Sequence, residues 1–201
     1  LRVQNALKDA LASATNINAG LMRFSDHGGP ILYPTTNIDQ SIDAQLSSST
    51  NASANDGYEI SSSVYTNTDE IILSFSTSPV TSAFRFEDLN IPRGATITSA
   101  YLKFTSAQYN IASTNITIAG ELTGDSSALT SASGSISGKT QTAAVVDWSV
   151  DNDFPSDGND VSSPDIAPVI QEIIDQSSWC GNNALTVLIN GEGTSTSSNR
   201  R

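Results

Sequence analysis

One stretch, residues 89–104, constrains the fold more than any other part of this chain of 201 residues. It begins with a tight turn at Pro92-Arg93-Gly94, because Pro fixes one backbone angle and Gly accepts a positive φ. After the turn, apolar and polar residues alternate, with one irregularity at Ser99-Ala100. This alternation predicts a long, half-buried strand whose inward side chains are Ile97, Tyr101 and Phe104.

Other short segments have the same character. Each is rich in β-branched or aromatic residues and is bounded by Gly, Asn, Asp or Ser. They are residues 83–86, 115–122, 143–150 and 184–190. Several short strands with turn residues between them predict an antiparallel β-sandwich of the jelly-roll kind. This architecture usually presents a surface rather than a catalytic cleft, which favours a binding function.

Residues 165–176 predict the one helix of the sandwich. Asp165 suits the N-cap or the first turn, and Pro168 falls where a missing N–H costs nothing. The apolar residues repeat at helical spacing and form a single stripe, which we expect to pack into the core: Ile166, Val169, Ile170, Ile173 and Ile174.

The charge balance limits the possible partners. The chain has 9 Lys and Arg against 21 Asp and Glu, a formal net charge of −12. Such an acidic surface repels phosphate backbones, so we expect no nucleic-acid partner. No apolar run approaches the roughly 20 residues of a membrane span. The few Lys and the many hydroxyl and amide side chains are typical of a secreted β protein.

The first forty residues differ from the rest. Residues 1–13 have helical spacing, residues 19–24 resemble a buried strand of a parallel sheet, and residues 31–34 predict a short edge strand. Such a helix–strand–strand unit cannot close a core alone. Since Leu1 begins inside the helical pattern, we expect a piece of a longer chain.

This region, with its GLMRF, GGP and NID motifs, resembles the von Willebrand factor A-type domain at the N-terminus of PilY-type adhesins of type IV pili. The resemblance covers residues 1–40. It implies a metal-dependent adhesion domain at a bacterial pilus tip, although none of the metal ligands of that family can be assigned here.

Residues 41–201 resemble a different family, the DNRLRE-type jelly-roll modules, which include carbohydrate-binding modules. The matching motifs are FRF, NIPRGATITSAYL, VDW, PDIAPVIQEI and WCGNNAL, in that order. The closing strand of the family is missing after residue 201. The two resemblances together imply a jelly roll inserted into an A-type domain, on a connection whose ends lie close together.

We therefore expect a non-enzymatic extracellular adhesion or binding module of a bacterial pilus or cell-surface protein, with a glycan or host surface as its ligand and the rest of the parent chain and pilus subunits as partners. The alternatives are an accessory carbohydrate-binding module of a polysaccharide-degrading enzyme and a structural subunit of an extracellular filament. No residues favour catalysis, since His27 stands without partners and Glu121, Glu172 and Glu192 are scattered.

One loop has the composition of a calcium site. Ca²⁺ binds six to eight oxygens, which Asp, Asn and backbone carbonyls supply. The predicted ligands are Asp151, Asp153, Asp157 and Asp160, and the alternative is a solvated acidic loop without metal. Asp125-Ser126 is a weaker candidate of the same kind.

The aromatic residues divide into core and surface. We expect Phe84, Phe86, Tyr101, Phe104 and Trp148 in strands, and Trp179 as a cap on the core. Sugar rings stack their C–H faces on exposed aromatic faces, so the candidates for glycan binding are the aromatics that the sequence places in loops: Tyr58, Tyr65, Tyr109 and Phe154. The negative charge favours neutral glycans, or a host-surface protein, over anionic polymers.

Cys180 has no second cysteine in this sequence to pair with. We expect a small, partly buried residue beside Trp179. The alternative is a disulfide with a cysteine outside this sequence.

Overall fold

The computed structural model describes residues 54–66, 68, 70–75, 77–107, 114–150 and 158–193, and the backbone of two short strands nearer the N-terminus. Those strands, β1 (Asn18–Ala19) and β2 (Thr36–Asn37), pair with each other in antiparallel fashion. The remainder of the predicted A-type segment lies outside the described residues.

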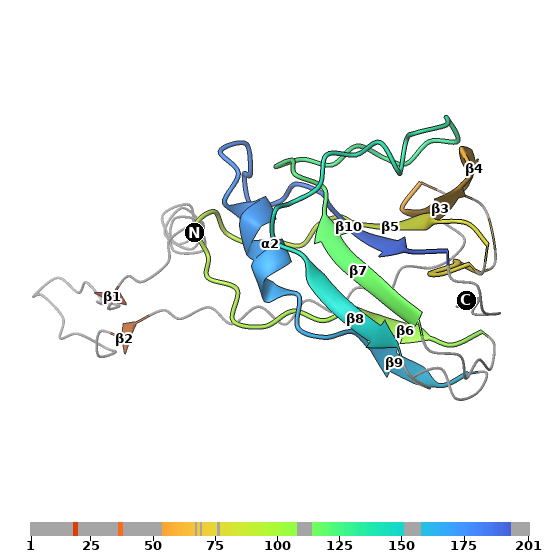
Figure 1. Ribbon diagram of the computed structural model, residues 1–201. Coiled ribbons are helices and arrows are strands. Elements are labelled where there is room, and N and C mark those ends of the chain that lie inside the picture. Colours follow the sequence, from red (N-terminus) through yellow and green to blue (C-terminus); the bar gives the residue numbers. More distant parts are fainter. Residues whose placement is uncertain are drawn as a thin grey trace, which may run out of the picture.

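The main sheet has six antiparallel strands in the order β4-β3-β5-β10-β7-β8 (Figure 1). These are β3 (Asp56–Ile60), β4 (Ser63–Tyr65), β5 (Val80–Phe86), β7 (Thr114–Gly120), β8 (Val146–Val150) and β10 (Leu185–Gly191). The last strand among the described residues, β10, lies at the centre between β5 and β7. The two halves of the sheet, β4-β3-β5 and β7-β8, are therefore joined only by β10.

A second, smaller layer covers one face of this sheet. It contains the two-stranded sheet of β6 (Lys103–Thr105) and β9 (Asp160–Ser162) and the helix α2 (Ala167–Ile174). Phe104 of β6 joins the layers, because its ring lies 5.4 Å from that of Phe84 and 6.0 Å from that of Trp148. The mainly β, antiparallel sandwich with one helix that the sequence predicts is confirmed.

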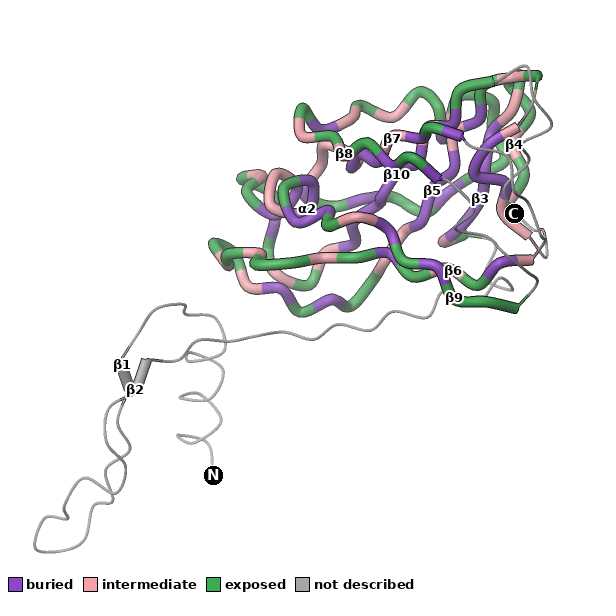
Figure 2. The backbone as a smooth tube through the Cα atoms, turned by 60° about the horizontal axis from the view of Figure 1, so that its bottom comes forward, coloured by how far each residue is buried: buried purple, intermediate pink, exposed green. Residues whose placement is uncertain are grey.

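The core fills the space between these layers (Figure 2). Alternate residues of β7, β8 and β10 face it, as do all five residues of the predicted helical stripe. Trp179 is fully buried, and its indole donates a hydrogen bond to the Ile91 carbonyl at 2.9 Å. The apolar stripe of α2 and Trp179 as a cap on the core are therefore confirmed. The helix is shorter than the predicted residues 165–176, and its N-cap is Ile166, so Asp165 precedes the helix and does not occupy the N-cap or the first turn.

The strand predicted after the turn is much shorter than expected. The turn itself forms, with Ala95 N–H donating to the Pro92 carbonyl and Gly94 at φ +76°. Residues 95–102 bond instead to the α2 region: Ile97 N–H donates to Gln171, and Ala100 N–H to Asp165. Of the long strand that the sequence predicts here, only the part that forms β6 pairs with another strand, β9.

The prediction for Tyr101 is wrong. Its side chain is 60% exposed, while the neighbouring Ala100 and Leu102 face the core. The alternation shifts by one residue at Ser99-Ala100, and such a shift turns each following side chain to the other face.

The prediction for Cys180 as partly buried is also wrong, since this residue is exposed. The chain turns after α2 so that Trp179 points inward. Its neighbour therefore points outward.

None of the described segments contains a helix with the length and hydrophobicity that a membrane crossing requires.

Candidate functional site

The aromatic pair of Tyr58 and Tyr65 lies at one edge of the main sheet. The two residues face each other across the β3–β4 hairpin. Their rings are stacked, with centroids 4.9 Å apart and planes inclined by 19°. Tyr58 is buried, whereas Tyr65 is 43% exposed. One face of the Tyr65 ring is therefore supported by Tyr58, and the residue still presents surface to solvent.

Both tyrosines lie in strands, which corrects their predicted placement in loops. The hairpin turns at Ser61-Ser62, where both residues have positive φ, 49° and 68°. Two positive φ values at the centre of a two-residue turn match the right-handed twist of the flanking strands. Ser-Ser is a poor sequence signal for this turn, because Asn-Gly or Asp-Gly usually fills it.

A small apolar cluster fixes Tyr58. It contains Ile72 and Val80, with Ile60 and Phe75 packed against it. Ser82 Oγ donates a hydrogen bond to the Ile72 carbonyl beneath the pair. Tyr58 therefore provides a packed surface on which the Tyr65 ring stacks.

Asp160 is the only predicted calcium ligand among the described residues. Its carboxylate forms an ion pair with Lys103 at 2.7 Å, and Thr105 Oγ1 donates to it at 3.3 Å. The Lys103 ammonium lowers the pKa of Asp160 by hydrogen bonding and by its charge. Asp151, Asp153 and Asp157 lie outside the described residues, as do Tyr109, Phe154 and His27.

The weaker candidate at Asp125-Ser126 has other roles. Asp125 accepts a hydrogen bond from Ala184 N–H, and Ser126 is buried against Glu121 and Thr186. Within the described ranges, no three His, Cys, Asp or Glu side chains are grouped to hold a metal ion.

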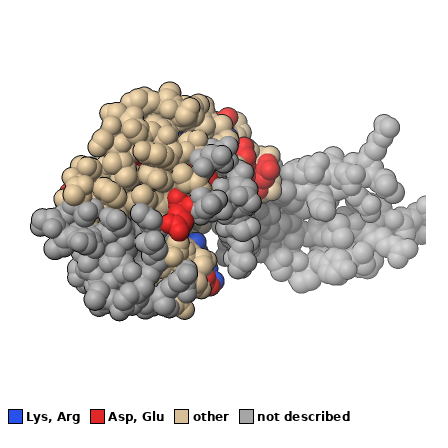
Figure 3. All heavy atoms as spheres, turned by 90° about the vertical axis from the view of Figure 1, so that its right-hand side faces the viewer, with Lys and Arg blue, Asp and Glu red and all other residues tan. Residues whose placement is uncertain are grey.

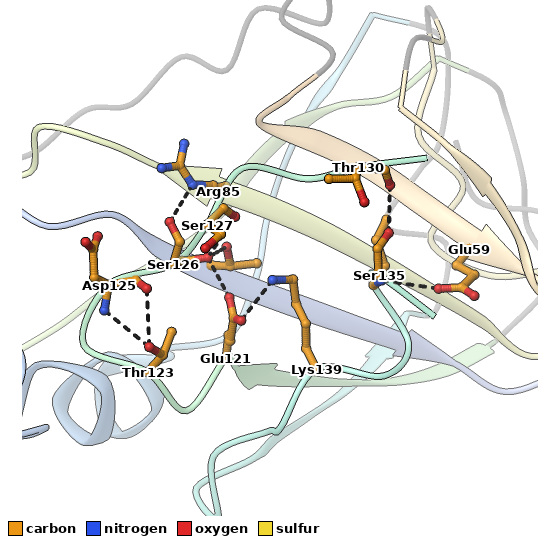
Figure 4. A network of polar contacts seen from close by, with 12 residues as sticks. Glu59, Arg85, Glu121, Thr123, Asp125, Ser126, Ser127, Thr130, Ser135 and Lys139 are labelled. Carbon is orange, nitrogen blue, oxygen red and sulfur yellow. Dashed lines mark hydrogen bonds and ion pairs between the residues drawn. The ribbon is translucent and has the colours of Figure 1, made fainter. Parts of the chain in front are cut away.

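The three glutamates that are scattered in the sequence, Glu121, Glu172 and Glu192, do not form a catalytic pair in the structure. Glu121 pairs with Lys139 at 2.8 Å, and both side chains are mostly buried (Figure 4). Glu172 accepts hydrogen bonds from the backbone of Ala143 and Ala144. Glu192 is exposed near the end of the described chain.

Sequence reasoning missed Glu59, a buried carboxylate of β3. It is 4% exposed and accepts backbone hydrogen bonds from Gly134, Ile136 and Ser137. Burial raises its pKa, but these hydrogen bonds outweigh burial, so the pKa lies below its usual value. The sequence offers one signal for this site, a glutamate between Tyr58 and Ile60 in a strand.

The outer face of the sheet, which carries Glu59 and lies opposite the face of Tyr58 and Tyr65, has a row of polar side chains. Thr81 Oγ1 donates to the Asn190 side chain at 3.2 Å, and the amides of Asn190 and Gln141 bond to each other. On the neighbouring strands, Ser149 donates to Asn115. The row is satisfied internally and contains no aromatic side chain among the described residues.

Comparison with protein-family models found no match, and comparisons with curated proteins and with solved structures found none either.

Proposed function

We propose that this protein is a non-enzymatic, extracellular binding module that recognises a glycan by stacking a sugar ring on Tyr65. The observation that carries the proposal is the Tyr58–Tyr65 pair, in which a buried ring supports a half-exposed one. The wider setting, a bacterial pilus tip or cell surface, rests on the family resemblances described above.

The geometry suits sugar recognition for two reasons. An aromatic face carries partial negative charge, which attracts the C–H groups on one side of a pyranose ring. A ring that is already held in place loses little conformational freedom on binding, so less of the contact energy is offset. The Tyr65 ring is restricted in this way because it stacks on Tyr58, which is packed in its apolar cluster.

The surface around the site favours an uncharged ligand. Figure 3 shows the side of the molecule on which β4 lies in Figure 1, and its described surface is mostly uncharged, with Asp and Glu in a few places and a little Lys or Arg. The net charge of −12 repels polyanions over longer distances. We therefore propose neutral glycans rather than uronate polymers.

The proposal is tested by glycan-array screening followed by calorimetry on the best neutral ligand. Tyr65→Ala should weaken binding by about tenfold or more, which corresponds to about 1.4 kcal/mol. Tyr65→Phe keeps the ring and should bind nearly as well as the parent. Tyr101→Ala is the matched control, because Tyr101 is the other exposed tyrosine among the described residues and its removal should leave affinity unchanged.

Two results would contradict this proposal. Equal losses in Tyr65→Ala and Tyr101→Ala would show that Tyr65 has no special role. Strong binding to uronate polymers that persists in EDTA would show that the charge argument is wrong.

A second candidate function, an accessory module of a polysaccharide-degrading enzyme, uses the same binding surface. The sequence of the parent gene distinguishes the two. A D-x-S-x-S loop upstream of Leu1 supports the adhesin, whereas a flanking catalytic domain supports the enzyme.

A further inference from the structure

A long segment between β7 and β8 folds back over the outer face of the main sheet. We name residues 122–140 the flap. Its base is closed by a bridge between Glu121 and Gln141 and by the backbone hydrogen bond from Leu122 N–H to the Thr140 carbonyl. In Figure 1 the flap is the green to teal trace above β3, β5 and β10. Connections this long in a compact domain often serve a function of their own.

The apolar contact beneath the flap is small. Leu129 and Ile136 of the flap meet Ala83 of β5 and Leu188 of β10, with Val64 of β4 at the side. The main core, by comparison, contains 19 buried residues. Since hydrophobic stabilisation scales with the apolar area that is buried, this contact holds the flap much more weakly than the core holds the sheet.

Near its start, the flap is held by polar contacts. Arg85 Nε donates to the Ser126 carbonyl at 2.9 Å, and Leu129 N–H donates to the Ala54 carbonyl at 2.9 Å. Ser126 Oγ contacts Glu121 and Thr186, and Figure 4 shows Glu121 between Ser126 and Lys139. This part of the flap is well anchored to β5 and β10.

Farther along, one side chain of the sheet supplies the contacts. The Glu59 carboxylate accepts from the N–H groups of Gly134 at 2.7 Å, Ile136 at 3.3 Å and Ser137 at 2.8 Å. Its register partners on the two adjacent strands, Val64 and Thr81, do not ionise. The flap's own charged side chains are Asp125, which accepts a hydrogen bond from Ala184 N–H, and Lys139, which is paired with Glu121.

We propose that the far part of the flap, residues 129–137, is a lid that opens while the start of the flap stays anchored through Ser126, and that Glu59 holds this lid shut. Opening exposes Ala83 and Leu188, which lie next to the polar row of Thr81 and Asn190. The lid therefore controls access to the outer face of the sheet. The lid acts independently of the proposed glycan site, because Tyr65 lies on the opposite face of the sheet.

Hydrogen exchange followed by mass spectrometry on the whole chain at neutral pH tests the lid. In the parent protein, amides of residues 129–137 should exchange at least about tenfold faster than those of β7 and β10, because local opening needs less free energy than global unfolding. Equal protection of the flap and of both strands would overturn the lid, since the flap would then open only with the whole fold.

The role of Glu59 is tested with Glu59→Gln and with Glu59→Asp, which keeps the charge but shortens the reach. Both should speed flap exchange about tenfold while β7 and β10 stay protected. Glu172→Gln is the matched control, because Glu172 also accepts two backbone N–H groups but lies outside the flap. No change in the Glu59 variants, or an equal change in Glu172→Gln, would overturn the assignment.

Discussion

Single residues hold this sandwich together where segments distant in sequence meet. Trp179 is the clearest case, because its indole fills the core and also satisfies the carbonyl of Ile91, 88 positions away. A buried carbonyl without a donor costs about 1–3 kcal/mol. This one side chain therefore joins the segment after α2 to the turn before residues 95–102.

We predict that Trp179→Phe lowers the free energy of unfolding by about 2–4 kcal/mol, because it removes buried volume and leaves the Ile91 carbonyl unpaired. Urea unfolding followed by circular dichroism measures the effect. Tyr101→Phe is the control, since it changes an exposed ring and should alter stability by less than about 0.5 kcal/mol. Similar midpoints for the parent and the Trp179 variant would contradict the role of the indole.

The pH dependence of stability has a definite sign at Glu59. Its folded-state pKa lies below the usual value of 4.5, so its contribution is present above that value and is lost as the pH falls through the folded pKa. We predict that the parent protein is more stable than Glu59→Gln at pH 7 and that the difference shrinks as the pH falls below about 4.5. Unfolding free energies of both proteins from pH 7 to 3 check this. A difference that stays constant with pH would refute the prediction.

At the scale of elements, α2 is fixed as much by its N-terminal neighbour as by its apolar stripe. The same Asp165 oxygen accepts hydrogen bonds from Ala167 N–H in the first turn and from Ala100 N–H, both at 2.9 Å. Asp165 precedes the N-cap, Ile166, and its side chain holds both the first turn of the helix and residue 100 beside it. Gly120 of β7 allows the close approach on the other side, because an added Cβ would lie 2.5 Å from Ile173 Cδ1.

We predict that Asp165→Ala lowers the free energy of unfolding by about 1–2 kcal/mol, the range for loss of a helix-capping acceptor. Asp165→Asn keeps an acceptor oxygen and should lose less than half of that. Thermal and urea unfolding of the two variants give the comparison. An asparagine variant as unstable as the alanine variant would mean that the charge, and not the hydrogen bonds, provides the stability.

At the scale of the whole molecule, the acidic composition raises the question of a bound cation. We propose that Asp151, Asp153, Asp157 and Asp160 bind Ca²⁺, on the basis of their composition and spacing. The Lys103 ammonium forms an ion pair with the Asp160 carboxylate, so a calcium ion that bound this carboxylate would have to displace the ammonium group. We expect this competition to lower the affinity for calcium.

Calcium at 100 times its dissociation constant should stabilise the domain by about 2.7 kcal/mol, because the ion binds the folded state only. The predicted result is a higher thermal midpoint in calcium than in EDTA, with a larger increase in Lys103→Gln. Magnesium at the same concentration is the control for ionic strength. An unchanged midpoint over a wide calcium titration would leave the solvated acidic loop as the better interpretation.

Local chemistry in the sequence determined much of this protein. The Pro92–Gly94 turn, the apolar stripe of α2 and the alternation in β7, β8 and β10 each depend on neighbours within a few residues. These features gave the mainly β class and most of the core. The same reasoning placed Trp179 inside, because a large ring beside a helix end needs burial.

Only the tertiary structure decided the features that join distant segments. The central place of β10 between β5 and β7 depends on pairings across the whole chain. The stacking of Tyr65 on Tyr58 depends on a tight turn at Ser61-Ser62, which these two residues do not predict. The burial of Glu59 depends on hydrogen bonds from the backbone of residues 134–137. The outward turn of Tyr101 follows from hydrogen bonds between Ala100 and residues 65 or more positions later. A sequence pattern reports the period of one segment, whereas these outcomes depend on which other segment lies opposite it.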